Sequence, residues 1–291
     1  MRKVFIAGCG YIGERIARTY QESGADVTCM IRSSEHASRL ESAGFATITS
    51  ALDDLTALPL LNLTDKILFY LVPPPGGGFI DTRARNFLAA LENNRPPVKI
   101  IYMSTTSVYS ETGGGVVTEE SPTAPASAMG KRRLDAETAF LAYGAANDVP
   151  VIILRVSGIY GPGRLPLMQI SQGQPLLLEA ESGLSNRIHA DDLAAICLAA
   201  AERTVANDIF NVSDGNPSSM TSYFNACADL LGYPRQPQVS MGEAGRIMSP
   251  LMFSYVTAAR SVDNSRMLER LNIILCYPSM LEGLPASIGE S

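Results

Sequence analysis

Three glycines near the amino terminus have the spacing of a phosphate-binding loop. Gly8, Gly10 and Gly13 follow the apolar run Val4–Ala7 and lead into a segment with helical spacing. In a strand–turn–helix unit, the first glycine makes the tight turn, the second lets the backbone approach a pyrophosphate, and the third lets the helix pack on the strand. The alternative is a glycine turn that binds no ligand. The predicted contacts of this loop are Gly8, Gly10, Tyr11, Ile12 and Gly13.

The end of the second predicted strand, residues 27–31, indicates which dinucleotide the loop holds. NAD sites place an acid about 20 residues beyond the glycines to bind the ribose 2′-hydroxyl, whereas NADP sites place an arginine near the 2′-phosphate. Here Ile31 occupies the acidic position, and Arg32 and Ser33 follow it. We therefore predict NADP, with NAD the less favoured cofactor. Alternatively, Arg32 is a solvated surface residue and Ser33 only caps the next helix.

Two further loops are predicted at the carboxyl ends of strands, where open α/β sheets bind ligands. One follows the strand 66–72 and reads Pro-Pro-Pro-Gly-Gly-Gly over 73–78, a sequence that continues neither a strand nor a helix. The other follows the strand 98–103 and concentrates hydroxyl groups at residues 104–107. Such a concentration is typical of a binding site, and its alternative is a strand with a polar end.

Strands and helices alternate along the chain, which predicts an α/β fold with a Rossmann-like, doubly wound parallel sheet. Asp191 or Asp192 is expected to begin one helix, and Gly232 to end another. His189 is expected to lie in the core rather than at a substrate. The expected helices are 14–20, 35–43, 81–93, 129–142, 167–171, 193–202, 220–231 and one within 258–271.

Four segments together resemble the extended short-chain dehydrogenase/reductases, the NAD-dependent epimerase/dehydratase family. The segments are Met103–Tyr109, Leu154–Gly163, Asn186–Ala194 and Phe210–Asp214. The resemblance covers nearly the whole chain. It implies a dinucleotide-binding domain over 1–157, completed by 188–213, and a smaller substrate lobe formed by 158–187 and 214–291.

The same resemblance implies an NADP-dependent oxidoreductase or epimerase that acts on a small polar or sugar-like substrate. Further cofactor contacts are implied at Leu71, Val72, Pro73, Lys131, Val156, Gly158 and Ile159. Substrate contacts are implied at Thr106, Ser107, Tyr160, Arg164, Arg187 and Arg260.

The chain departs from this family at the position that carries the chemistry. The family's active site has a hydroxyl residue after the fifth strand and a Tyr-x-x-x-Lys motif on the next helix. Thr105 matches the hydroxyl and Lys131 the lysine, but Ser127 stands in place of the tyrosine. A phenol titrates near pH ~10 and an aliphatic hydroxyl several units higher, so Ser127 is a poor general base.

Three interpretations of Ser127 remain open. The serine can be only a helix cap, because serine is a preferred cap residue. It can form a nucleophilic pair with Lys131, although no Gly-x-Ser-x-Gly motif supports acyl transfer. A proton relay can instead use Tyr109, Tyr160 or a substrate group. The missing tyrosine favours a second function class, a redox-inactive NADP-binding sensor or regulatory protein.

Composition limits the remaining function classes. With 291 residues, 46% of them hydrophobic, the chain can bury a full core. Its five scattered cysteines predict neither disulfides nor a zinc site, but small buried residues in a reducing compartment. A net charge of −6 and a pI near 5.1 argue against a nucleic-acid partner.

The first apolar run is too short for a signal peptide or membrane span. We predict a cytoplasmic monomer or homodimer with a small-molecule substrate and no metal.

Overall fold

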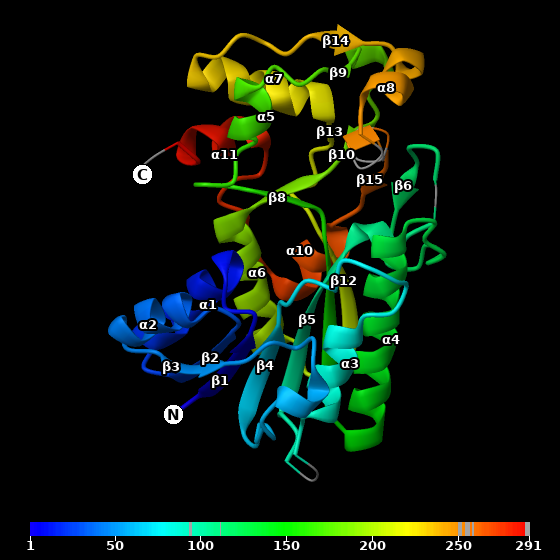
Figure 1. Cartoon of the computed structure of the whole chain (residues 1–291). Coiled ribbons are helices and arrows are strands. Elements are labelled where there is room, and N and C mark those ends of the chain that lie inside the picture. Colours follow the sequence, from blue (N-terminus) through cyan, green and yellow to red (C-terminus); the bar gives the residue numbers. More distant parts are fainter. Residues whose placement is uncertain (93–94, 111, 250–251, 254–256, 258, 289–291) are drawn as a thin grey trace. The chain divides into compact units, whose positions relative to one another are not determined.

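The computed structural model describes residues 1–92, 95–110, 112–249, 252–253, 257 and 259–288. The chain forms two compact units, each built from three segments (Figure 1). The first unit comprises 1–110, 122–155 and 193–210, and the second comprises 111–121, 156–192 and 211–291. Residues 111–121 group with the second unit because the strand Val116–Val117 pairs there with Ser261–Val262.

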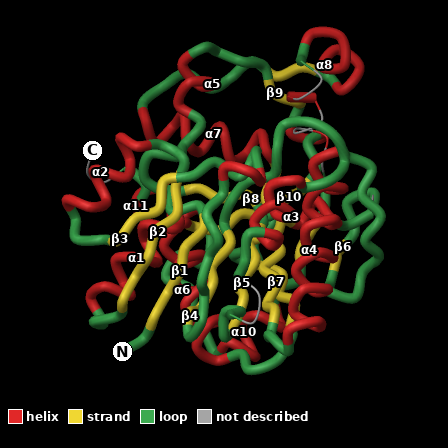
Figure 2. Tube along the Cα trace, turned by 60° about the horizontal axis from the view of Figure 1, so that its bottom comes forward, coloured by secondary structure: helices red, strands yellow, loops and turns green. Residues whose placement is uncertain are grey.

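A seven-stranded sheet organises the first unit and confirms the predicted fold class. Its strand order is β12-β7-β5-β4-β1-β2-β3, and Figure 2 shows β3, β2, β1, β4, β5 and β7 of this sheet. The pairs β1–β2, β1–β4, β2–β3 and β4–β5 are parallel. The order reverses at β1, so the carboxyl ends of β1 and β4 form a switch point, where such sheets bind ligands. The strands are β1 Lys3–Ala7, β2 Asp26–Ile31, β3 Ala46–Thr49, β4 Lys66–Tyr70, β5 Lys99–Thr105, β7 Val151–Val156 and β12 Asp208–Val212.

Helices cover both faces of this sheet. Figure 1 shows α3 and α4 on one face and α1 with α6 on the other, where the Tyr20 hydroxyl donates to Glu202 at 3.1 Å. Tyr70 of β4, Tyr102 of β5 and Phe140 of α4 form an aromatic cluster between sheet and helix, with ring centroids 4.8–6.0 Å apart. The helices are α1 Tyr11–Glu22, α2 Ser34–Ser42, α3 Thr82–Ala89, α4 Ala128–Asn147 and α6 Ala190–Arg203, with the 3₁₀ turns η1 Leu55–Ala57 and η2 Thr106–Val108.

Short strand pairs and five helices make up the described part of the second unit. Its core contains Tyr160, Tyr223 and Leu284. The helices are α5 Leu167–Ser171, α7 Met220–Leu231, α8 Met241–Ile247, α10 Ser265–Leu271 and α11 Met280–Ala286, with the turn η3 Glu179–Glu181. The paired strands are β6 Val116–Val117 with β15 Ser261–Val262, β8 Gly158–Tyr160 with β11 Arg187–His189, β9 Leu176–Leu177 with β14 Gln238–Val239, and β10 Leu184–Ser185 with β13 Ser218–Ser219.

Several predicted boundaries differ from the structure. Helix α3 ends at Ala89, and part of the stretch predicted to extend it lies outside the described residues. Helix α6 begins at Ala190, so Asp191 and Asp192 lie inside its first turn and do not precede it. The Asp192 carboxylate accepts the amides of Cys276 and Tyr277 at 2.8 and 2.9 Å, a use that no helical pattern reveals.

Four of the five cysteines are buried as predicted, but Cys276 is exposed. Its amide is fixed by Asp192 while its side chain remains at the surface. Among the described residues, no helix combines the length and apolarity needed to cross a bilayer.

Candidate active site

The glycine loop turns sharply between β1 and α1. Gly8 has φ +85°, a conformation that favours glycine, and its amide donates to Met30 O at 2.9 Å. A Cβ on Gly8 would lie 2.9 Å from the Val72 nitrogen, and the Leu71 amide donates to Ala7 O at 2.9 Å. The loop therefore lies directly against the segment that follows β4, at the switch point of the sheet.

The other two glycines have the different environments that a phosphate loop requires. A Cβ on Gly13 would lie 3.0 Å from Gly8 O, so this residue allows close packing of helix on turn. A Cβ on Gly10 would meet nothing within 4 Å. Gly10 is also the N-cap of α1 and supplies no side-chain cap. The open space is thus at the positive end of a helix, where anions bind.

The end of β2 carries one exposed arginine. Ile31 is buried at the predicted acidic position, and Arg32 after it is exposed. The Arg32 side chain makes no hydrogen bond or ion pair within the described part of the chain. Ser33 caps α2, because its hydroxyl accepts from the His36 amide at 3.3 Å. The alternative raised by the sequence, an exposed Arg32 beside a capping Ser33, therefore also matches this geometry.

A charged cluster joins the first turn of α1 to α2. The Glu14 carboxylate binds the Arg39 guanidinium and lies 2.9 Å from His36 Nε2. Burial alone would raise the pKa of Glu14, but the hydrogen bonds and charges of Arg39 and His36 hold it below its usual value. The Glu14 carboxylate is thereby already paired with positive charge.

The four hydroxyl residues at the end of β5 and in η2 differ in exposure. Thr105 Oγ1 accepts from the Ser107 amide at 2.9 Å and is also hydrogen-bonded to the Ser107 hydroxyl. Thr105, Thr106 and Ser107 are all partly exposed. Ser104 is buried instead and donates to Glu137 at 2.6 Å. Three of the four hydroxyl residues are therefore partly exposed at the carboxyl end of β5.

The start of α4 packs against this hydroxyl turn. A Cβ on Gly130 would lie only 2.3 Å from Ser107 O, so only glycine permits this approach. Ser127 Oγ caps the helix by accepting from the Gly130 amide at 3.1 Å, as one interpretation of the sequence required. Ser127, Lys131 and Ser107 are thus brought together by a glycine in the first turn of a helix. Glycine is unfavourable within a helix, so Gly130 was a sign of this close approach that sequence reasoning missed.

Lys131 contacts a residue that sequence reasoning missed. Its Nζ lies 4.9 Å from the centroid of the Phe79 ring, in the loop between β4 and α3. The next residue, Arg132, donates to Gly78 O at 2.7 Å. The Pro- and Gly-rich loop therefore lies against the start of α4, and it adds an aromatic ring to the lysine.

Tyr109 lies inside a buried polar network. Its side chain is 1% exposed, and the Arg155 guanidinium lies 4.9 Å from the ring centroid. Arg155 in turn binds Glu137, which also accepts the Ser104 hydroxyl. Tyr109 would have to leave this network before its phenol could reach a substrate.

The predicted residues of the second unit differ widely in exposure. Tyr160 is 1% exposed and donates to Ser279 O at 3.3 Å, and burial raises the pKa of its phenol above the usual value. Arg187 is 5% exposed and donates to Ser218 Oγ at 2.6 Å. His189 is fully buried, as predicted. Val156 is buried, Ile159 and Arg260 are partly exposed, and Gly158 and Arg164 are exposed.

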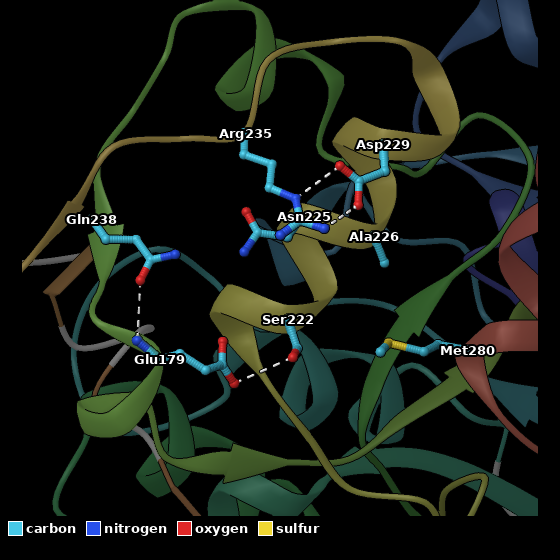
Figure 3. Close-up of a pocket in the computed structure, with 8 residues that line it drawn as sticks. All are labelled: Glu179, Ser222, Asn225, Ala226, Asp229, Arg235, Gln238 and Met280. Carbon is cyan, nitrogen blue, oxygen red and sulfur yellow. Dashed lines mark hydrogen bonds and ion pairs between the residues drawn. The ribbon is translucent and has the colours of Figure 1, made fainter.

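A cavity of about 400 Å³ in the second unit contains none of the predicted site residues (Figure 3). Its wall is the face of α7 that carries Asn225 and Asp229. Within it, Arg235 makes two hydrogen bonds to Asp229, at 2.9 and 2.7 Å. The polar groups of this cavity mostly bind one another. Among the described residues, no cluster of three metal-ligating side chains occurs.

Comparison with known proteins agrees with the fold. Residues 82–213 match the model of the NAD dependent epimerase/dehydratase family. A 3-diazoavenalumate denitrifying reductase of a Streptomyces species is 27% identical over 146 residues, which are 48% of each protein. The chain thus spans about half the length of that relative. Protein YeeZ of Escherichia coli K12 is 26% identical over 97% of this chain and 98% of its own.

Solved structures share the whole architecture. A conserved protein of unknown function from Silicibacter pomeroyi has a TM-score of 0.78 and is 26% identical, over 98% of both chains. MoeE5 in complex with UDP-glucose and NAD has a TM-score of 0.76 at 22% identity, over 98% of this chain and 97% of its own. The second likeness concerns the fold alone.

Proposed function

We propose that this chain binds NADP and acts as an oxidoreductase or epimerase on a small polar or sugar-like substrate. The observation that carries the proposal is the arrangement of the three glycines. Gly8 makes the turn against Val72, Gly13 packs the helix, and Gly10 faces open space at the start of α1. A glycine turn with no ligand would have no need of an open helix N-terminus at the switch point.

NADP supplies or accepts a hydride when it is bound. The chain's own residues would bind and orient the substrate and move its proton. Thr105 presents a partly exposed hydroxyl already ordered by Ser107, and Lys131 presents a positive charge one turn into α4. These two groups can stabilise a carbonyl or alkoxide oxygen. Of the proton groups that the sequence suggested, Ser127 is engaged as a helix cap and Tyr109 is buried beside Arg155.

The exposed Arg32 supports NADP over NAD. Its guanidinium follows β2 where a carboxylate would bind a 2′-hydroxyl, and a guanidinium suits a phosphate. The cofactor contacts proposed at Leu71, Val72 and Pro73 follow β4 beside the glycine loop.

A second candidate function is a redox-inactive NADP-binding sensor or regulatory protein. It is favoured by Ser127, because the serine that stands in place of the family's tyrosine is engaged as a helix cap. A capping hydroxyl is a weak acid and a weak base, so binding would persist without turnover.

Calorimetric titration with NADP and NAD tests the cofactor assignment. We expect tighter binding of NADP, and Arg32→Ala should weaken NADP binding roughly ten-fold while leaving NAD nearly unchanged. Arg203→Ala is the matched control, because Arg203 is also exposed but lies in the last turn of α6. Equal affinities of the native protein for the two dinucleotides would contradict the assignment.

A further inference from the structure

Two adjacent large apolar side chains are exposed in the loop between β4 and α3. Phe79 is 62% exposed and Ile80 is 50% exposed. Most aromatic side chains of the first unit are buried, including Phe5, Phe69 and Phe87. Two neighbouring apolar residues at the carboxyl edge of a parallel sheet present surface that a ligand can cover.

The loop is fixed on both sides of these residues. Before them, the Arg132 guanidinium donates to Gly78 O at 2.7 Å, and Arg132 is itself buried. After them, the Asp81 amide donates to Asp135 Oδ2 at 3.0 Å. The backbone is therefore held at Gly78 and Asp81, so Phe79 is presented outward and cannot readily fold into the core.

The Phe79 ring adjoins the candidate catalytic groups. Lys131 Nζ lies 4.9 Å from its centroid, and Gly130 brings the same helical turn against Ser107. The chain of contacts thus runs from the ring through Lys131 to the hydroxyl turn. An oxygen atom that binds Lys131 would lie within reach of an apolar surface.

We propose that Phe79 and Ile80 form the apolar contact of this site and select a substrate that carries an apolar group next to its reacting carbonyl or hydroxyl carbon. This inference rests on the proposed function, and within its substrate class it favours a small polar molecule with an apolar substituent over a sugar-like one. A substrate with hydroxyl groups on every carbon would leave both side chains in water. One with an aromatic or alkyl substituent would bury them while its oxygen faces Lys131.

Two ketones that differ in one substituent test this preference. In 2-hydroxyacetophenone the carbonyl carries a phenyl ring, whereas in dihydroxyacetone it carries a second hydroxymethyl group. Both are titrated by calorimetry into native protein saturated with NADP. We expect 2-hydroxyacetophenone to bind at least ten-fold more tightly, and Phe79→Ala to remove that preference. Val98→Ala is the control, because Val98 is 51% exposed and immediately precedes β5, at the amino end of the strand.

A spectroscopic variant gives a second readout. The chain contains no tryptophan, so F79W introduces a single indole into the loop. We expect F79W to retain the preference and its emission to change when 2-hydroxyacetophenone binds. Equal affinities for the two ketones, no ketone binding, or a preference unchanged by Phe79→Ala would overturn the inference. If the native protein did not bind NADP, the proposed function would be overturned, and this inference with it.

Discussion

The Arg155 guanidinium lies 2.8 Å from the Glu137 carboxylate, and both side chains are almost completely buried. The pair joins β7 to α4, and Ser104 of β5 donates to the same carboxylate. One polar network therefore connects β5, β7 and α4, the helix that carries Lys131. The network also holds the Tyr109 ring under Arg155.

Breaking this pair should destabilise the first unit strongly. Glu137→Ala leaves the Arg155 charge buried without its partner, which typically costs about 3–5 kcal/mol. The measurement is the free energy of unfolding in urea. Asp229→Ala is the control, because it breaks the exposed pair with Arg235 and should change stability little. If both variants unfolded at the same denaturant concentration, the network would not have the structural role assigned to it.

Gly10→Val should abolish dinucleotide binding in a protein that remains folded. The valine would project into the open space over α1, where we place the pyrophosphate. Circular dichroism checks the fold and calorimetry the binding. Gly242→Val is the matched control, because a Cβ at Gly242 also meets nothing within 4 Å but lies in α8. Unchanged NADP affinity in folded Gly10→Val would place the phosphates elsewhere.

Turnover of simple hydroxy and keto substrates should be weak in the native protein. General acid–base catalysis typically contributes about 10²–10⁴-fold, and Ser127 replaces the phenol that would supply it. Ser127→Ala should lower stability by about 1 kcal/mol through loss of the cap while leaving NADPH oxidation unchanged. Lys131→Ala should remove the remaining turnover, and Ser127→Tyr should raise it if the phenol fits.

The three variants separate the interpretations of Ser127. Turnover lost in Ser127→Ala as fully as in Lys131→Ala would show that the serine acts chemically and is more than a cap. If Ser127→Ala retained robust turnover, Tyr109 and Tyr160 would be the next candidates for the proton-transfer group. The variants Tyr109→Phe and Tyr160→Phe would then test that role.

Asp214 should make stability depend on pH. The side chain is 5% exposed, and burial raises its pKa from 3.8 to about 7, although the Asn216 amide and Arg187 act in the opposite direction. The folded chain then binds a proton that the unfolded chain has released between about pH 4 and 7. Stability should fall as pH rises through this window, by at most about 4 kcal/mol. Urea unfolding of Asp214→Asn should show a flatter dependence, and identical slopes in both proteins would refute the assignment.

The sequence predicted those features that depend on neighbouring residues. The Gly8–Gly13 turn, the Ser127 cap and the end of α7 at Gly232 all follow from local backbone geometry. Helices α5 and α7 occupy the predicted residues because their apolar spacing is regular and their ends are marked. The fold class was therefore accessible from patterning alone, while the roles assigned to the site residues stay predictions.

Contacts between distant segments were not predictable in the same way. Phe79 meets Lys131, and Glu137 meets Arg155, only because the folded sheet aligns the ends of its strands. No periodicity in the sequence pairs these residues. Asp192 likewise resembled a helix cap in sequence, but it binds amides of a segment more than eighty residues later.

The position of β12 at the edge of the sheet has a consequence for biosynthesis. Strand β7 ends at Val156 and is buried at every residue, yet its outer neighbour begins only at Asp208. While the ribosome makes the intervening residues, the apolar edge of β7 is unpaired. Unpaired apolar edges recruit other strands, so the nascent chain is most prone to aggregation during this interval. Shielding by a chaperone would matter most before residue 212 leaves the exit tunnel.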